Sequence, residues 1–211
     1  SLNNIKISNG VISIGEGAFQ SCTSLTSIKF PNSITSLGNY MFDGCTNLTS
    51  IEVEENNKNY MDGNGVLYTK DGSEIIRYPE GKKETIYTIL TGTTSIRDCA
   101  FMECTSLTNI VIPNSVTSIG SNVFYNCSSL TSIVVEEGNT IYDSRNNCNA
   151  ILHTELKMLV AACPTTVILD VLEIIGDNAF QGVYPFQELV LPHNVKCIGR
   201  SAFGDNPSLQ R

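Results

Sequence analysis

The chain repeats itself with a period of 23 residues, and this self-similarity constrains its fold more strongly than any local motif. Segment 37–53 repeats segment 14–30 position by position. One phenylalanine marks the register in each of six copies, at Phe19, Phe42, Phe101, Phe124, Phe180 and Phe203. A short fixed period is typical of a solenoid, in which each repeat forms one coil and contacts only its neighbours.

Each copy combines two patterns of apolar residues. Residues 25–30 follow the pattern Leu-x-x-Ile-x-Phe, and its alternating second half predicts a short, half-buried strand. Before this strand, apolar residues lie four positions apart, at Ile14, Ala18 and Cys22, which is the spacing of one face of a helical turn. We therefore expect an α/β solenoid with short parallel strands on one face and short helical or 3₁₀ turns on the other.

Two insertions interrupt the register, at residues 54–83 and 136–162. Each contains two strand-like runs joined by a turn, such as Asp71-Gly72 in the first, and therefore predicts a β-hairpin. With the coils around them, the insertions give a higher-order period of roughly 80 residues. We expect both hairpins to project from equivalent edges of the solenoid. The tight coils are assigned to residues 14–53, 96–135 and 175–211.

We expect residues 1–211 to form a single domain that is a fragment of a longer repeat array. Leu2, Ile5 and Ile7 already fit the strand positions of a further coil, and the coil that begins at Phe203 is incomplete at Arg211. Solenoids normally carry polar capping repeats, and neither end of this sequence has a distinctive one.

The charge balance argues against two classes of partner. The 13 Lys and Arg residues and 21 Asp and Glu residues give a formal net charge of −8. Nucleic acids and anionic membrane surfaces attract clusters of Lys and Arg, so we expect no nucleic-acid partner. The sequence also has no apolar run long enough to cross a bilayer, so we expect no membrane insertion by this segment.

The cysteines favour packing over metal binding. Cysteine behaves as a small hydrophobic residue when buried, and the sequence lacks the C-x-x-C spacing of a zinc site. We expect no metal and no cofactor. Cys148 and Cys163 flank the second hairpin, which leaves a disulfide across it open, and Cys99 is expected to be partly exposed. Four of the eight cysteines share one core-facing repeat position, at Cys22, Cys45, Cys104 and Cys127.

No residues of this sequence assemble a recognisable catalytic pattern. The two histidines, His153 and His193, lack the local signature of a Cys-His or Ser-His pair. Segment 62–65 resembles a calcium loop only faintly, because the ligand pattern of an EF-hand is missing. The acidic pairs at 54–55 and 136–137 recur because the coils recur, and we interpret them as solvated charges. We therefore expect no enzymatic activity.

The fuller repeat phrase resembles the BspA-like, or Treponema pallidum type, class of leucine-rich repeats. Residues 96–118 carry this resemblance, from Ile96-Arg97-Asp98-Cys99-Ala100-Phe101 through Ile112-Pro113-Asn114-Ser115-Val116-Thr117-Ser118. It covers essentially the whole chain and implies a leucine-rich-repeat solenoid. It also implies a secreted or surface-attached bacterial protein, located extracellularly or at the cell surface, from a group associated with host-protein binding and cell attachment.

The strand residues that point away from the core form our candidate protein-binding surface, because repeat proteins usually bind through extended faces. The valines among them would form an exposed apolar strip, and Lys29 and Glu52 would pair across adjacent strands. Tyrosines in the insertions either contact a partner or pack the hairpin onto the solenoid. The candidate residues are Ser27, Lys29, Glu52, Asn109, Val111, Val134, Val190, Tyr68 and Tyr78.

From these features we expect a non-enzymatic protein-binding or adhesion module. The resemblance implies a protein partner, either a host extracellular-matrix protein or another bacterial surface protein. The alternative is a structural spacer or scaffold that displays other domains and has no ligand of its own. Under that alternative, the outward strand residues form a passive sheet face.

Overall fold

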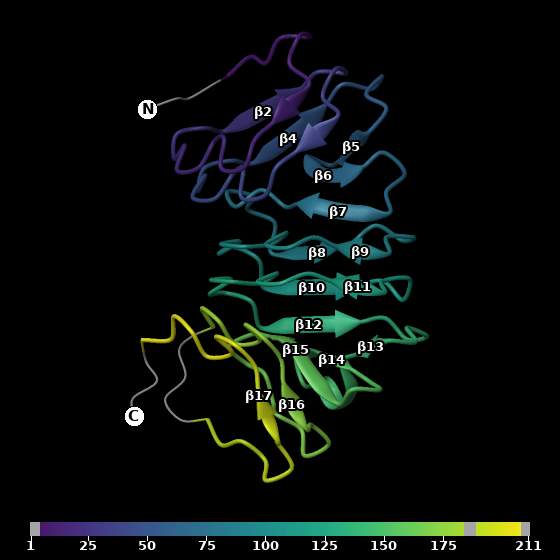
Figure 1. Ribbon diagram of the computed structural model, residues 1–211, viewed down its shortest axis with the longest axis vertical. Coiled ribbons are helices and arrows are strands. Elements are labelled where there is room, and N and C mark those ends of the chain that lie inside the picture. Colours follow the sequence, from purple (N-terminus) through teal and green to yellow (C-terminus); the bar gives the residue numbers. More distant parts are fainter. Residues whose placement is uncertain (1–4, 184–188, 208–211) are drawn as a thin grey trace.

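A computed structural model describes residues 5–183 and 189–207 and shows a β-solenoid whose coils stack along the long axis of the molecule (Figure 1). The predicted parallel strands are confirmed, and equivalent residues pair at the expected interval, as Ile110 does with Ile133. The longer strands are β2 (Ser27–Phe30) and β4 (Ser50–Val53), which pair together, and β8 (Ile86–Thr88), β10 (Asn109–Ile112) and β12 (Ser132–Val135), which form one sheet.

A second row of short parallel strands follows the first row around each coil. Gly38 follows one of these strands. A residue with a side chain would not fit there, because its Cβ atom would lie 2.3 Å from the backbone nitrogen of Glu16 in the preceding coil. The coils are therefore in backbone contact on this side as well. These strands are β1 (Ser13–Ile14), β3 (Ser36–Leu37), β9 (Ser95–Ile96), β11 (Ser118–Ile119), β16 (Ile174–Ile175) and β17 (Cys197–Ile198).

The expectation of helical turns is wrong, and the chain around each marker phenylalanine consists of tight turns. Within the described residues the only helical segment is a 3₁₀ turn, η1 (Arg145–Asn147). The second residue before and the second residue after each marker phenylalanine have positive φ, as Gly17 and Ser21 do around Phe19. A left-handed residue at every fourth position ends any right-handed helix, so the observed spacing comes from consecutive turns.

Both predicted hairpins are confirmed, but they are part of the solenoid wall and do not project from it. In each insertion a further strand precedes the hairpin, and the last strand joins the row of short strands in parallel pairing. The first insertion contains β5 (Tyr60–Gly63), β6 (Val66–Thr69) and β7 (Glu74–Arg77). The second contains β13 (Tyr142–Asp143), β14 (Ala150–His153) and β15 (Met158–Ala162).

Polar side chains attach the start of each insertion to the preceding coil. The Asn57 side chain donates to the carbonyl of Pro31 at 2.9 Å and accepts the backbone N–H of Tyr60 at 2.9 Å. Glu54 accepts the backbone N–H of Asn32 at 2.8 Å, so its carboxylate closes a turn and is not merely solvated. In the second insertion, Asn139 and Glu136 make the corresponding contacts, to Val116, Tyr142 and Asn114.

Ladders of aromatic rings and thiols fill the core. Phe19 stacks on Phe42 with ring centroids 5.5 Å apart, and Phe180 stacks on Phe203 at 5.2 Å. The Sγ of Cys45 donates to the carbonyl of Phe19 at 3.0 Å, which explains why a cysteine suits this repeat position. Burial raises the pKa of Cys45 to about 11. The corresponding thiol of Cys127 donates to the carbonyl of Phe101 at 2.9 Å.

For the other cysteines, one open alternative is decided and one expectation, that for Cys99, is corrected. Cys148 and Cys163 are free and buried, so the open possibility of a disulfide is not realised. The Sγ of Cys163 instead donates to the carbonyl of Asn149 at 3.2 Å. Cys99 is buried and not partly exposed, and the guanidinium of Arg77 donates to its carbonyl at 2.5 Å.

Candidate protein-binding surface

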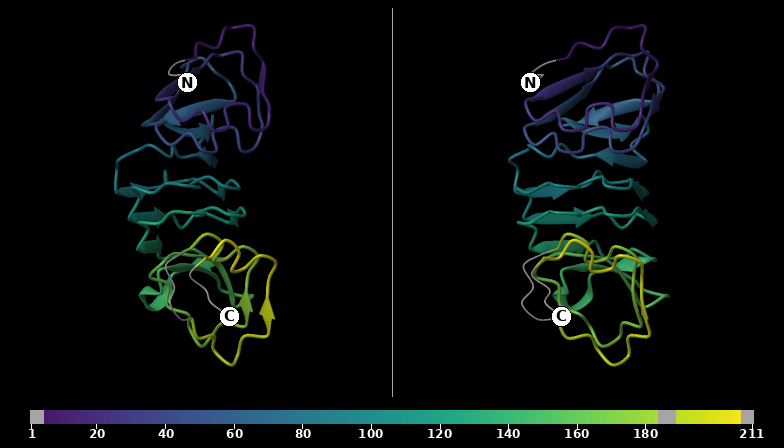
Figure 2. Two further views of the ribbon diagram at one scale, coloured as in Figure 1. Left: turned by 90° about the vertical axis from the view of Figure 1, so that its left-hand side faces the viewer. Right: turned by 60° about the vertical axis from the view of Figure 1, so that its left-hand side comes forward.

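The outward face of β8, β10 and β12 brings together three of the predicted site residues. In register, Thr88 lies beside Val111, which lies beside Val134, and in the neighbouring row Asn109 lies between the first residue of β8 and the first of β12. Val134 is 44% exposed and Val111 is half-buried. The face is therefore uncharged and partly apolar, and it runs across three consecutive coils (Figure 2).

Sequence reasoning missed the most exposed apolar residue of this face. Ile86, the first residue of β8, has 63% of its surface exposed and pairs with Asn109. The signal was available, because strand alternation that turns Tyr87 and Ile89 inward also turns Ile86 and Thr88 outward. Ile86, Thr88, Asn109, Val111, Ser132 and Val134 together are called the central face below.

The remaining strand candidates lie elsewhere. Ser27, Lys29 and Glu52 lie on the separate β2–β4 sheet, where Lys29 is directly opposite Glu52. The first insertion separates this sheet from the central face, and the carbonyl of Gly65 accepts the backbone N–H of Ile51 at 2.9 Å there. The ion pairs found within the described residues do not include one between Lys29 and Glu52.

Val190 is placed away from every other candidate. It lies outside the strands and is 76% exposed. Part of the strand that we predicted around it, residues 184–188, falls outside the described residues. The predicted valine strip therefore includes Val111 and Val134 but does not extend in a strand to Val190.

Tyr68 and Tyr78 are corrected from surface contacts to core residues, as the packing alternative predicted. Neither side chain is more than 1% exposed. The hydroxyl of Tyr68 lies 2.7 Å from that of Tyr87, and the ring of Tyr78 stacks on Phe101 with centroids 5.4 Å apart. Burial raises the pKa of both tyrosines above the usual value. Tyr78 thus takes the place of a marker phenylalanine in a coil that lacks one.

A buried charge cluster beside Tyr78 was also missed by sequence reasoning. The guanidinium of Arg77 pairs with the carboxylate of Glu80 and lies 3.4 Å from Asp43. Glu80 also accepts the backbone N–H of Gly44 at 3.1 Å, while its other carboxylate oxygen has no hydrogen-bond partner among the described residues. Burial, opposed by Arg77, raises the pKa of Glu80 to about 7. The cluster fixes the first insertion to the coil of Asp43.

In residues 5–183 and 189–207, His, Cys, Asp and Glu side chains do not gather in groups of three that would hold a metal ion. The same ranges contain no helix that is both apolar and long enough to span a bilayer.

Comparisons with solved structures show the same fold in proteins of three bacteria. The pneumococcal vaccine antigen PcpA has a TM-score of 0.62 at 24% identity, over 95% of this chain and 41% of that chain. A leucine-rich repeat protein from Eubacterium ventriosum has a TM-score of 0.62 at 22% identity, over 99% and 65% of the two chains. A leucine rich cell surface protein from Faecalibacterium prausnitzii has a TM-score of 0.59 at 22% identity, over 97% and 56%.

The chain therefore spans less than two thirds of the length of each of these proteins. Among curated proteins none matches the chain. The sequence profile described as BspA type Leucine rich repeat region matches six copies, over residues 1–76, 78–160 and 161–211. These matches cover nearly every residue, and the chain belongs to the family of BspA-type leucine-rich repeat regions.

Proposed function

We propose that this chain is a non-enzymatic protein-binding module of a bacterial surface or secreted protein and that it binds through the central face. The observation that carries the proposal is the presence of two large exposed apolar side chains, Ile86 and Val134, on the same outward face of one regular sheet. Exposed apolar patches on soluble proteins mark interaction sites. The sheet holds these side chains without any rearrangement, so little conformational entropy is lost on binding.

The chemistry of the central face fits a protein contact better than a reaction. Its residues are Ile, Thr, Asn, Val, Ser and Val, and none of them titrates near neutral pH. Hydroxyl and amide groups lie among the apolar residues in both rows of the face, so a partner can combine apolar contact with hydrogen bonds there. The related cell surface protein of Faecalibacterium prausnitzii supports an extracellular location. Attachment to a host extracellular-matrix protein or to another bacterial surface protein is the finer form of this proposal.

The test is a binding assay of the purified chain against immobilised extracellular-matrix proteins and bacterial surface extracts. The double variant Ile86→Ser/Val134→Ser makes the two most exposed apolar positions of the central face polar. Val167→Ser is the matched control, because Val167 is 55% exposed and lies outside the central face. We expect the double variant to lose a partner that both the wild-type chain and the control retain.

The other candidates are assayed separately in the same experiment. Variants Lys29→Glu and Val190→Ser test the β2–β4 sheet and the isolated valine, respectively. A partner that is lost with either of these, and retained by the double variant, contradicts the central face as the contact. If neither the wild-type chain nor any variant binds a partner, the spacer alternative is the better account.

A further inference from the structure

The two insertions join the solenoid in the same way, at positions 84 residues apart. The backbone N–H of Tyr78 donates to the carbonyl of Ala100 at 2.8 Å, and that of Ala162 donates to Ala179 at 3.0 Å. Likewise, Glu74 pairs with the first residue of β9, as Met158 pairs with the first residue of β16. Tyr78 and Ala162 are therefore equivalent, and so are the residues before them, Arg77 and Ala161.

The side chains at these equivalent positions differ greatly in volume. In the first insertion, the ring of Tyr78 and the guanidinium of Arg77 fill the space between coils. In the second, two alanine methyl groups stand in their place, and a cavity of about 420 Å³ opens between the coil after β11 and the coils of β15 to β17. This volume lies within the range of about 300–1,000 Å³ that is usual for small-ligand sites.

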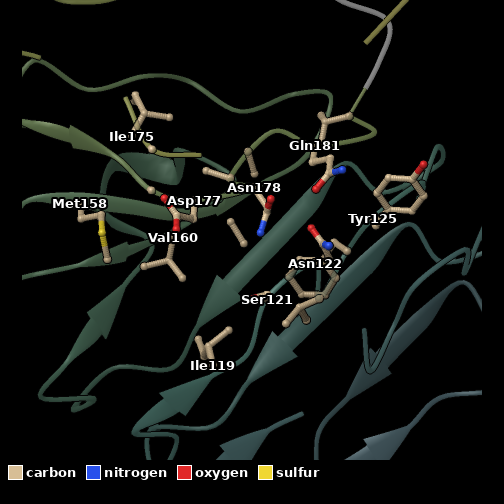
Figure 3. A pocket seen from close by; sticks show the side chains of 18 of the residues that line it. Ile119, Ser121, Asn122, Tyr125, Met158, Val160, Ile175, Asp177, Asn178 and Gln181 are labelled. Atoms are coloured by element: carbon tan, nitrogen blue, oxygen red, sulfur yellow. The ribbon is translucent and has the colours of Figure 1, made fainter. Parts of the chain in front are cut away.

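The cavity has an apolar end and an amide end. Met158, Val160 and Ile175 gather at the first, where Asp177 also lies, and Asn122, Asn178 and Gln181 at the second (Figure 3). The methyl group of Ala162 and the ring of Phe124, which belongs to the aromatic ladder, also line the space. The exposed residues Ser121 and Asp177 lie at the rim and connect the cavity with solvent.

The polar groups of the lining select for a neutral hydrogen-bond donor. The Oδ1 atom of Asn122 is buried and has no hydrogen-bond partner among the described residues. A buried acceptor without a partner is unfavourable, and a donor brought in by a ligand removes this penalty. The lining includes no Lys or Arg, and Asp177 is its single charged residue, so an anionic ligand is disfavoured.

We propose that this cavity binds an aromatic side chain with a hydrogen-bond donor, tyrosine above all, presented by a protein partner. The first insertion shows what fills the equivalent positions in this architecture, namely the ring of Tyr78 and, beside it, the guanidinium of Arg77. A partner's tyrosine would place its ring at the Ala162 position and its hydroxyl toward Asn122. The proposal rests on the proposed function only in taking the partner to be a protein, and it adds a pocket distinct from the central face.

The test uses a small probe, N-acetyl-L-tyrosinamide, titrated into the full chain and followed by amide NMR shifts. We expect saturable shifts confined to residues 119–125, 158–162 and 174–183, which surround the cavity. The variant Ala162→Tyr gives the chain its own tyrosine ring at the place where the ring of the probe would bind. We expect it to weaken probe binding by at least about tenfold, since an occupied pocket must be vacated before the probe enters.

A second variant keeps the proposal falsifiable if Ala162→Tyr does not fold. Asn122→Gly removes the unpaired acceptor and suits the positive φ of 54° at this position. We expect it to abolish the preference of the pocket for N-acetyl-L-tyrosinamide over N-acetyl-L-phenylalaninamide. Val171→Ser, at an exposed position outside the lining, is the control and is expected to bind the probe as the wild-type chain does.

Three outcomes would overturn the inference. The first is the absence of saturable shifts at millimolar probe, and the second is undiminished binding to Ala162→Tyr. The third is saturable binding of N-acetylglucosamine in place of the tyrosine probe, which would make the cavity a sugar site. Failure here leaves the binding assay with the Ile86→Ser/Val134→Ser variant untouched, so the two proposals fail independently.

Discussion

The two insertions make equivalent backbone contacts with the solenoid at their starts and ends but have different interiors. Each begins with an asparagine that anchors it to the preceding coil and ends with a strand that joins the row of short strands. The first is closed by Tyr78, Arg77 and Glu80, whereas the second carries Ala162 and Ala161 and encloses a cavity. Backbone hydrogen bonding between coils thus sets the architecture. We call the place where the end of an insertion packs against the neighbouring coils a junction, and a few side chains there decide whether the space is filled or is left as a pocket.

The largest effect is expected from opening the first junction. Tyr78→Ala would create there the space that the second junction already has, and we expect the free energy of unfolding to fall by about 4 kcal/mol. Denaturant unfolding followed by circular dichroism measures it. Tyr78→Phe is the control, because the Tyr78 hydroxyl is buried without a hydrogen-bond partner in the described structure and its removal should cost nothing. A loss below 1 kcal/mol for the alanine variant would show that the coils collapse onto the gap.

The next effect is a pH dependence that only the first junction should have. Burial raises the pKa of Glu80 to about 7, so the folded chain binds a proton there more tightly than the unfolded chain, whose pKa is near 4.5. The stability from this group is complete below pH 4.5 and is lost as the pH rises to about 7.

Glu80→Gln isolates this contribution. We expect the variant and the wild-type chain to be equally stable near pH 4, and the variant to be more stable by up to ~3 kcal/mol at pH 8. Unfolding measured at both pH values checks it. A difference between the two chains that does not change with pH would mean that Arg77 holds Glu80 ionised throughout.

The smallest effect is expected from closing the second junction. Ala162→Tyr introduces the residue that the first junction has at this position, and we expect the free energy of unfolding to rise by about 1–2 kcal/mol. Thermal unfolding without any ligand measures this gain. Ala202→Tyr is the contrasting control, since Ala202 is buried and does not line the cavity, so overpacking should destabilise the chain. If both variants destabilise the chain, the two junctions differ in backbone as well as in side chains.

The register of the coils could be predicted because the repeat period can be read directly from the sequence. The pairing of Ile110 with Ile133 follows from the 23-residue interval alone. Helical turns were wrongly predicted because a spacing of four apolar residues also arises from successive tight turns. Residues with positive φ, such as Asn122 and Asn126 around Phe124, were the available sign, since Asn and Gly favour this conformation.

The interiors of the insertions could not be predicted in the same way, because the insertions do not follow the short repeat of the tight coils and so their register cannot be read from it. Arg77 and Asp43 are 34 positions apart in the sequence, and only the coil stacking brings them to 3.4 Å. Tyr78 follows a hairpin strand, and nothing local shows that it continues the aromatic ladder. The outward face of β8, in contrast, follows from strand alternation once the inward residues are known.

The thiols that donate to the carbonyls of the preceding coil have a consequence for the biogenesis of the chain. A thiolate is the species that reacts with oxidants, and the folded chain disfavours it at Cys45, whose pKa burial raises to about 11. An unfolded chain exposes all eight thiols at their ordinary reactivity. In an oxidising environment, folding therefore competes with cross-linking, and the stacking of coils protects the buried cysteines only after it is complete, whereas Cys197 stays exposed.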